Sequence, residues 1–261
     1  MSKIEKTLYL LEAIEINNSI EVPKFDPRAS IICVIIFIGV IISIPVGRVD
    51  ITVWFALYPI IASPIFGLQF SKIFLQSLIV LPFVLFIAIF NPLIDKNVVF
   101  YVGNVGVTEG WLSFSGLILR SLLCMQAILI MIRSMGYLGV IRGMERLGLP
   151  KFLSAPLFMI FRYMRVLLEE ALTMRRAVAS RGFGKKHLSL RLWGILIGQL
   201  FIRSIDRAER INRAMLARGF KGTLPTFSRL NPWRTKDTVY LVSWCLVFAF
   251  LRIFNLSILF Q

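Results

Sequence analysis

The sequence predicts an all-α integral membrane protein with about five transmembrane helices and a separate region of long amphipathic helices. Hydrophobic residues make up 57% of the 261 residues, and the mean hydropathy is +0.77, which is more apolar than an ordinary soluble domain. The chain also carries a net charge of +16. A basic excess on a very apolar chain is typical of a membrane protein with positive cytoplasmic loops, and the apolar content argues against nucleic acid as the partner.

Five apolar stretches predict the transmembrane helices, because roughly 20 apolar residues are needed to cross about 30 Å of hydrocarbon. They are residues 29–46, 51–68, 73–93, 112–132 and 239–259. Asp26, Pro27 and Arg28 precede and cap the first stretch, and Pro59 and Pro64 are expected to kink the second.

Two further features of this region are a charged residue inside an apolar stretch and a polar segment between two such stretches. Arg120 interrupts the fourth stretch, so its charge must be buried against the helix bundle or extended to the membrane surface. Residues 94–110 are polar and glycine-rich and predict a loop.

Residues 133–237 differ in character from the rest of the chain. They carry 21 of the 30 basic residues and 6 of the 14 acidic ones, a net charge of +15. Two apolar patches, residues 153–161 and 192–202, would reach only about 14 and 17 Å as helices, which is too short to cross. We interpret them as the apolar beginnings of amphipathic helices, with entry into the membrane as the open alternative.

The positive-inside rule predicts the topology of the chain. It places the basic region and the N-terminus in the cytoplasm and the C-terminus outside the cell membrane. The predicted organisation is an N-terminal cytoplasmic or interfacial segment (1–28), a four-helix transmembrane region (29–132), a cytoplasmic helical region (133–237) and a final transmembrane helix (238–261).

The small counts of reactive residues argue against an enzyme. His187 is the one histidine of the sequence, so histidine-based metal sites and catalytic triads are not expected. Cys33, Cys124 and Cys245 each lie in an apolar stretch and are expected to pack as small side chains. The sequence has no phosphate-binding GxxxxGK[ST] loop. We therefore predict no catalytic residue, no metal site and no cofactor.

An internal repeat stands out in the basic region. Residues 176–183 match residues 213–220 at an offset of 37, with Arg, Ala, Arg, Gly and Phe in the same places. The two windows end helix-compatible runs, from about residue 151 or 152 to 181 and from about 188 to 218. Gly182 and Gly219 are expected to end these helices at positive φ, and Arg181 and Arg218 lie where the helix dipole favours a cation.

Two interpretations of this repeat are open. Each Arg could do no more than stabilise a helix end, with the following Phe packed beside it. Alternatively, two exposed Arg tips insert into partner proteins, a role that suits the permanently charged, multidentate guanidinium.

The motifs resemble the transmembrane T component of energy-coupling factor (ECF) transporters. That family has a pair of Ala-Arg-Gly triplets, each ending a long coupling helix. Residues 217–219 have the triplet intact, and residues 180–182 read Ser-Arg-Gly. Residues 25–29 (FDPRA) resemble the entry to the family's first span, residues 147–150 (LGLP) the turn before its first coupling helix, and residues 162–170 (RYMRVLLEE) a run of its cobalt and nickel branch, CbiQ.

The resemblance implies a scaffold that joins two cytoplasmic ABC ATPase subunits to a membrane substrate-binding S component and holds no ATPase of its own. It implies uptake of a transition metal ion, cobalt or nickel, or of a vitamin. The site residues that it implies contact the ATPases: Ser180, Arg181, Gly182, Ala217, Arg218 and Gly219. The apolar halves of the helices would contact the S component or pack beneath the transmembrane helices, and four aromatic residues are candidates for this: Phe158, Phe161, Trp193 and Phe201.

Two other functions remain as alternatives. A permease subunit of another ABC transporter type would be expected to have one coupling helix, so the tandem repeat disfavours it. A membrane-bound lipid or isoprenoid enzyme would need clustered carboxylates for Mg²⁺. Glu169 and Glu170 are the one adjacent acidic pair of the sequence, and they lie among arginines, where ion pairing is the better account.

Overall fold

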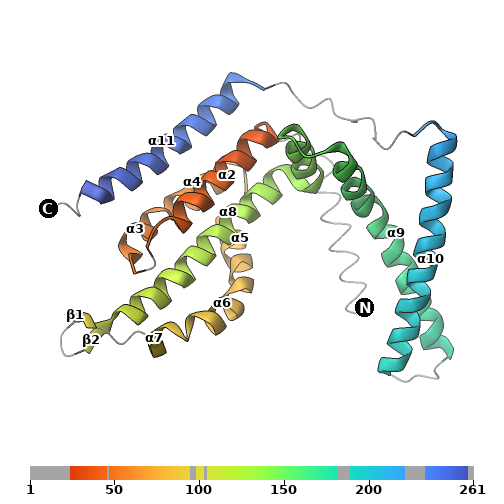
Figure 1. Ribbon diagram of the computed structural model, residues 1–261, viewed down its shortest axis with the longest axis horizontal. Coiled ribbons are helices and arrows are strands. Elements are labelled where there is room, and N and C mark those ends of the chain that lie inside the picture. Colours follow the sequence, from red (N-terminus) through yellow and green to blue (C-terminus); the bar gives the residue numbers. More distant parts are fainter. Residues whose placement is uncertain are drawn as a thin grey trace. The chain divides into compact units, whose positions relative to one another are not determined.

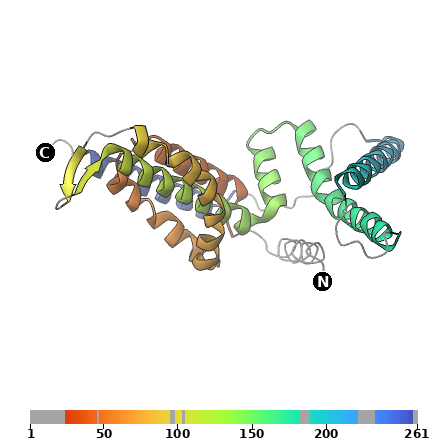
Figure 2. The ribbon, with the colours of Figure 1, turned by 90° about the horizontal axis from the view of Figure 1, so that it is seen from below.

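The computed structural model describes residues 24–45, 47–94, 98–102, 105–181, 189–220 and 233–257. Its regular structure in these residues is helical apart from one short β-hairpin (Figures 1 and 2), so the predicted all-α class is confirmed. The chain divides into two compact units. We call residues 21–144 with 229–261 the apolar unit, and residues 1–20 with 145–228 the basic unit.

Helices of the apolar unit follow all five predicted apolar stretches (Figure 1). The first stretch forms α2 (Pro27–Ile42), where Pro27 takes the first helical position and the Asp26 carboxylate accepts a hydrogen bond from the Arg28 backbone N–H at 2.9 Å. The remaining elements are α3 (Val49–Trp54), α4 (Leu57–Ile65), α5 (Phe70–Ser77), the 3-10 turn η1 (Leu78–Val80), α6 (Leu81–Ala88), α7 (Asn91–Ile94), α8 (Glu109–Arg146) and α11 (Thr235–Ser257).

Proline and glycine explain where these helices are interrupted. The second stretch breaks between α3 and α4 at Phe55 and Ala56, one turn before Pro59. The ring of a proline clashes with the carbonyl four residues earlier, which here belongs to Phe55, so the kink predicted at Pro59 is confirmed. Pro64 lies inside α4 and does not interrupt it, so the kink predicted there is wrong. Gly136 interrupts α8 with a φ of 67°, a conformation that a side chain would strain.

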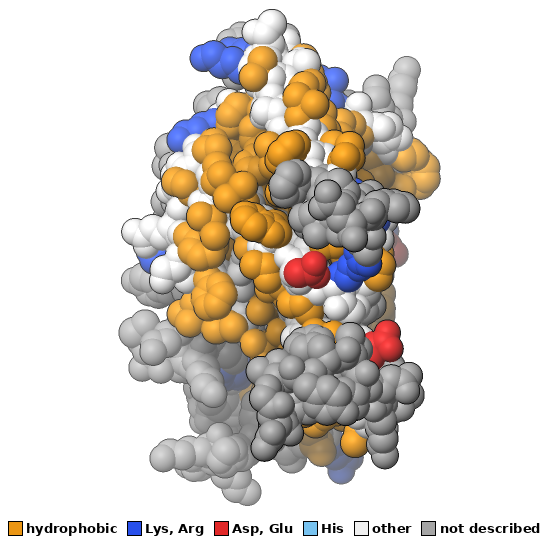
Figure 3. Space-filling model, turned by 90° about the vertical axis from the view of Figure 1, so that its left-hand side faces the viewer, with side chains coloured by type: hydrophobic (Ala, Val, Ile, Leu, Met, Phe, Trp, Pro, Cys, Tyr) orange, Lys and Arg blue, Asp and Glu red, His pale blue; other side chains and the backbone are white. Residues whose placement is uncertain are grey.

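Two of the described helical segments have the length and composition of membrane-crossing helices. Among the described residues, the segments Phe70–Leu93 and Glu109–Arg146 are long and apolar enough to cross a membrane, and Pro27–Ile42 and Val49–Ile65 are shorter apolar helices. Large side chains such as Ile79, Phe83 and Phe86 are about 70% exposed. Hydrophobic side chains also dominate the described surface on the face in Figure 3. Surfaces of this kind are suited to lipid or to protein partners.

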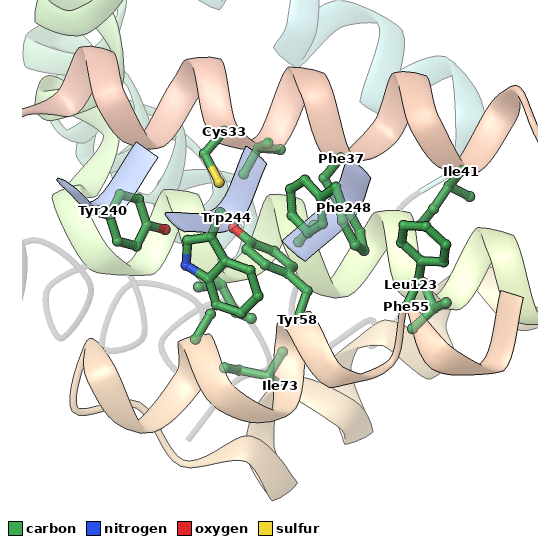
Figure 4. Close-up of a cluster of buried hydrophobic side chains, with 14 of the residues drawn as sticks. Cys33, Phe37, Ile41, Phe55, Tyr58, Ile73, Leu123, Tyr240, Trp244 and Phe248 are labelled. Carbon is green, nitrogen blue, oxygen red and sulfur yellow. The ribbon is translucent and has the colours of Figure 1, made fainter. Parts of the chain in front are cut away.

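An aromatic cluster forms the core of the apolar unit (Figure 4). Phe37 of α2 lies 5.3 Å from Phe248 of α11 and 4.5 Å from Tyr58 of α4, measured between ring centroids. Tyr58 in turn meets Trp244 edge-to-face at 4.7 Å. These offset and edge contacts are the favoured arrangements of aromatic rings, and they join α2, α4 and α11.

Arg120 is buried and donates a hydrogen bond from Nη2 to the Pro45 carbonyl just beyond α2, so its charge packs against the bundle.

The predicted loop over residues 94–110 is wrong in part. It contains an antiparallel hairpin of β1 (Val98–Val102) and β2 (Val105–Thr108), because Val, Phe and Tyr in this stretch favour strands.

The basic unit contains two long helices, α9 (Lys151–Arg181) and α10 (Leu190–Ala217), which pack against each other (Figures 1 and 2). The ends predicted for both helices agree with these bounds to within two residues. Pro156 lies inside the second turn of α9, where few backbone hydrogen bonds are lost. Ser189 caps α10 by accepting a hydrogen bond from the Leu192 backbone N–H at 3.3 Å.

Candidate functional site

An ion-pair cluster joins α9 to α10 where the two helices cross. The carboxylate of Glu170 in α9 accepts hydrogen bonds from Arg207 at 2.7 Å and from Arg203 at 3.5 Å, both in α10. The Glu170 side chain is only 16% exposed, so water weakens this pair less than it weakens a surface pair. The ion pairing expected for the Glu169–Glu170 run is confirmed for Glu170.

The positions of this cluster follow the internal repeat. Glu170 and Arg207 are 37 residues apart, which is the offset between the two repeated windows. The crossing therefore brings together equivalent positions of the two repeats. Arg181 lies eleven residues beyond Glu170, and Arg218 lies eleven beyond Arg207, so each is about 16 Å along its helix from the crossing.

The end of α10 has the hydrogen bonds of a Schellman motif. The backbone N–H of Phe220 donates to the Met215 carbonyl at 3.0 Å, and that of Gly219 donates to the Leu216 carbonyl at 2.9 Å. Gly219 has a φ of 80°, so the predicted glycine stop is confirmed. Arg218 is the C-cap residue and is exposed. Within the described residues its guanidinium makes no ion pair, which leaves it open to a partner.

The end of α9 is described only in part. Ser180 is exposed, and its hydroxyl donates to the Arg176 carbonyl one turn earlier at 3.0 Å. Arg181 is the last helical residue, and Gly182 lies outside the described residues. The structure thus brings Ala217, Arg218 and Gly219 together at the end of α10, and Ser180 and Arg181 at the end of α9.

An apolar groove of about 770 Å³ lies between the first half of α9 and the second half of α10. It reaches from Phe152 and Met159 in α9 to Met215 in α10 and Phe220 just beyond its end. The end of α10 therefore lies beside the beginning of α9, and the two Arg-bearing ends lie on opposite sides of the crossing. This groove was not predicted, although residues 152, 156, 160, 163 and 167 have the spacing of one helix face.

The four aromatic residues predicted to contact an S component do not line this groove. Phe158, Phe161, Trp193 and Phe201 are absent from its walls. Trp193 and Phe201 instead belong to an exposed stripe on α10, which they share with Ile197 and Ile205 at helical spacing. These four side chains are between 43% and 65% exposed.

The described reactive side chains are too dispersed to form a metal centre. Across the described ranges, no three His, Cys, Asp or Glu side chains come close enough together to hold a metal ion. Cys33 is buried, and Cys124 and Cys245 are half-buried free thiols. His187 lies outside the described residues.

Comparison with known proteins identifies the family. The sequence profile of the CbiQ family, described as a cobalt transport protein, matches residues 21–227. An uncharacterized protein of Methanocaldococcus jannaschii is 30% identical over 122 residues, which is 46% of this chain and 41% of that protein. The chain thus matches less than half the length of this relative. The match and the apolar helices show a membrane protein of a transport family, and the chain belongs to the CbiQ family of cobalt transport proteins.

Proposed function

We propose that the chain is the transmembrane T component of an ECF-type importer. In this role it transmits the ATP-driven motion of two cytoplasmic ATPase subunits to a membrane S component that binds the substrate. The family match supports a transport subunit. The observation that carries the more specific role is the pair of crossed helices, each of which ends in a small residue followed by Arg.

The geometry of the two tips supports contact with two similar subunits. Arg181 and Arg218 lie at equal distances beyond the crossing, on opposite sides of it. One tip for each subunit of an ATPase pair fits this arrangement better than two tips on a single partner. Gly219 directs the chain away from the helix directly after Arg218, which keeps the guanidinium accessible.

The ion pairs at the crossing support transmission of force. Glu170 holds Arg203 and Arg207 across the helix pair, so a push on one tip moves both helices rather than one alone. The exposed stripe on α10 and the groove beside α9 are the apolar surfaces that could receive this motion. Three methionines line the groove (Met159, Met164 and Met215), and methionine adapts well to different partner surfaces.

The cargo and the topology follow from the same proposal. The family name favours cobalt as the transported substrate, and nickel or a vitamin are the other candidates. Substrate binding is assigned to the S component and ATP hydrolysis to the ATPases, so this subunit is non-catalytic. We place the basic unit in the cytoplasm and the C-terminus outside the cell membrane, in line with the positive-inside rule.

A double charge reversal tests the coupling role. Arg181→Glu with Arg218→Glu should abolish co-purification with the ATPase pair, while the protein still inserts into the membrane. The matched control is Arg176→Glu with Arg213→Glu, which reverses the same number of charges five residues earlier in each repeat. Within the described part of the chain, Arg213 makes one ion pair, an exposed one with Glu209, and the loss of this pair should cost little.

The outcomes separate a specific contact from a general charge effect. Loss of the ATPases in the tip variant alone supports the proposal. ATPase binding and transport that survive in the tip variant would refute it. Equal loss in both variants would also refute it, because the charge of the helices and not the tips would then hold the partner.

A further inference from the structure

A second groove, on the apolar unit, has no part in the proposed coupling role. It lies between α4 and α11 and has a volume of about 550 Å³, within the range of small-molecule sites. Leu57, Ile61 and Ile65, on successive turns of one face of α4, form one wall. Val239 and Val247 of α11 form the other.

The side chains at the floor of this groove are buried in the core, whereas those of its walls are exposed. Tyr240 and Trp244 form the floor, and each is only 6% exposed. The Tyr240 ring stacks on Phe25 at 4.5 Å, and Trp244 packs against Tyr58 in the aromatic core. By contrast, Ile61 is 39% exposed and Val239 67% exposed. The groove is therefore preformed and can bind an apolar ligand without rearranging the core.

One end of the groove is basic. Lys236 lines it at the beginning of α11. The Lys24 ammonium donates a hydrogen bond to the carbonyl of Ile65, another lining residue, at 3.1 Å. Asp237 is nearby but is buried and accepts hydrogen bonds from the backbone of Asp26 and Arg234. Within the residues that the structure describes, Lys236 has no carboxylate partner, so positive charge at this end is available to an anion.

The length of the groove matches one leaflet of a bilayer. The α11 wall runs from Lys236 to Val247, a rise of eleven residue steps or about 16 Å. This is about half of the roughly 30 Å hydrocarbon core. A partner helix that crossed the membrane would need a groove of twice this length, whereas a lipid chain ends at the bilayer midplane.

We propose that this groove binds an anionic phospholipid of the surrounding bilayer. One acyl chain lies on Tyr240 and Trp244 between the walls, and Lys24 and Lys236 hold the phosphate. With the predicted topology the lipid belongs to the cytoplasmic leaflet, where anionic lipids attract basic residues. The proposal does not depend on the coupling role.

The test is native mass spectrometry of the full-length protein in detergent, with equal amounts of dioleoylphosphatidylglycerol and dioleoylphosphatidylcholine added. Wild type should form a single-lipid adduct that favours phosphatidylglycerol. Lys24→Gln with Lys236→Gln should reduce this preference about 25-fold, since each lysine contributes about fivefold. Glutamine at residue 24 keeps a donor for the Ile65 carbonyl.

Two controls keep the test specific. Lys72→Gln removes an exposed lysine of α5 outside the groove and should leave the preference unchanged. Ile61→Trp fills the groove and should remove both lipid adducts, whereas Leu75→Trp, at an exposed position of α5, should not. The proposal is overturned if Lys72→Gln acts like the double variant, if Ile61→Trp retains the adduct, or if a second protein copy occupies the groove as a lipid-independent dimer.

Discussion

The strength of the Glu170–Arg207 ion pair can be predicted from its burial. A second pair, Glu209–Arg213, has the same 2.7 Å separation, but its side chains are 59% and 76% exposed, against 16% and 35% for Glu170 and Arg207. A charged hydrogen bond in a partly buried site contributes about 1.5–3 kcal/mol, and some screening remains at Arg207. We expect a coupling energy of about 1–2 kcal/mol for the crossing pair, and no more than about 0.5 kcal/mol for the exposed pair.

Two double-mutant cycles measure these energies. The first uses Glu170→Gln and Arg207→Gln, and the second uses Glu209→Gln and Arg213→Gln. Hydrogen exchange of backbone amides in the middle of α9 and α10 reports the local opening free energy without unfolding the apolar unit. The measured coupling should fall less with added salt for the crossing pair than for the exposed pair. Equal couplings, or a coupling near zero for Glu170 and Arg207, would refute the assignment of this pair as the link between the helices.

Four further substitutions should affect stability. Gly219→Ala should destabilise the end of α10 by about 1–2 kcal/mol because its φ is 80°, whereas Gly198→Ala, in open space inside α10, should stabilise it by up to about 1 kcal/mol; hydrogen exchange at the two sites compares them. Gly143→Ala places a Cβ 2.6 Å from the Cδ1 of Ile31 and should cost about 1–3 kcal/mol, seen as a lower Tm in detergent; an unchanged Tm would contradict the contact of α8 with α2. Asp237→Ala leaves two backbone N–H groups without their acceptor and should also lower the Tm, by the equivalent of about 2–3 kcal/mol, while an effect below about 0.5 kcal/mol would contradict its role in joining α11 to α2.

Local signals in the sequence predicted most of the helices. Asp26 followed by Pro27 specifies the beginning of α2, and Gly219 specifies the end of α10, because each acts through its own backbone or that of its neighbours. The break at Phe55 also follows from a local rule that concerns Pro59. The hairpin at residues 98–108 was missed because its glycines and polar residues pointed to a loop, and strand pairing outweighed them.

The features that were not predicted depend on contacts between helices. Ion pairing of Glu170 was expected, but its partner Arg207 was not, because this pair needs both helices to cross at those residues and a repeat offset does not define a crossing point. The groove beside α9 is likewise formed by the faces of two helices. In the sequence, only the face of α9 shows a regular spacing of apolar residues. Residue type alone pointed to Phe158 and Phe161 as contacts of an S component, and that remains a prediction. The groove is lined instead by their neighbours Met159 and Ile160.

The repeat and the crossing together bear on what the Arg tips do. Where equivalent positions of the two repeats meet, the residues differ: Glu170 faces Arg207, and two like charges there would repel. At the tips, which lie on opposite sides of the crossing, the residues are the same, Arg181 and Arg218. Contact between the helices thus requires complementary residues. By contrast, no contact between the two helices requires Arg181 and Arg218 to be the same residue. A matching requirement from outside, such as two similar ATPase subunits, accounts for this difference better than helix capping alone, because many residues other than Arg can end a helix before glycine.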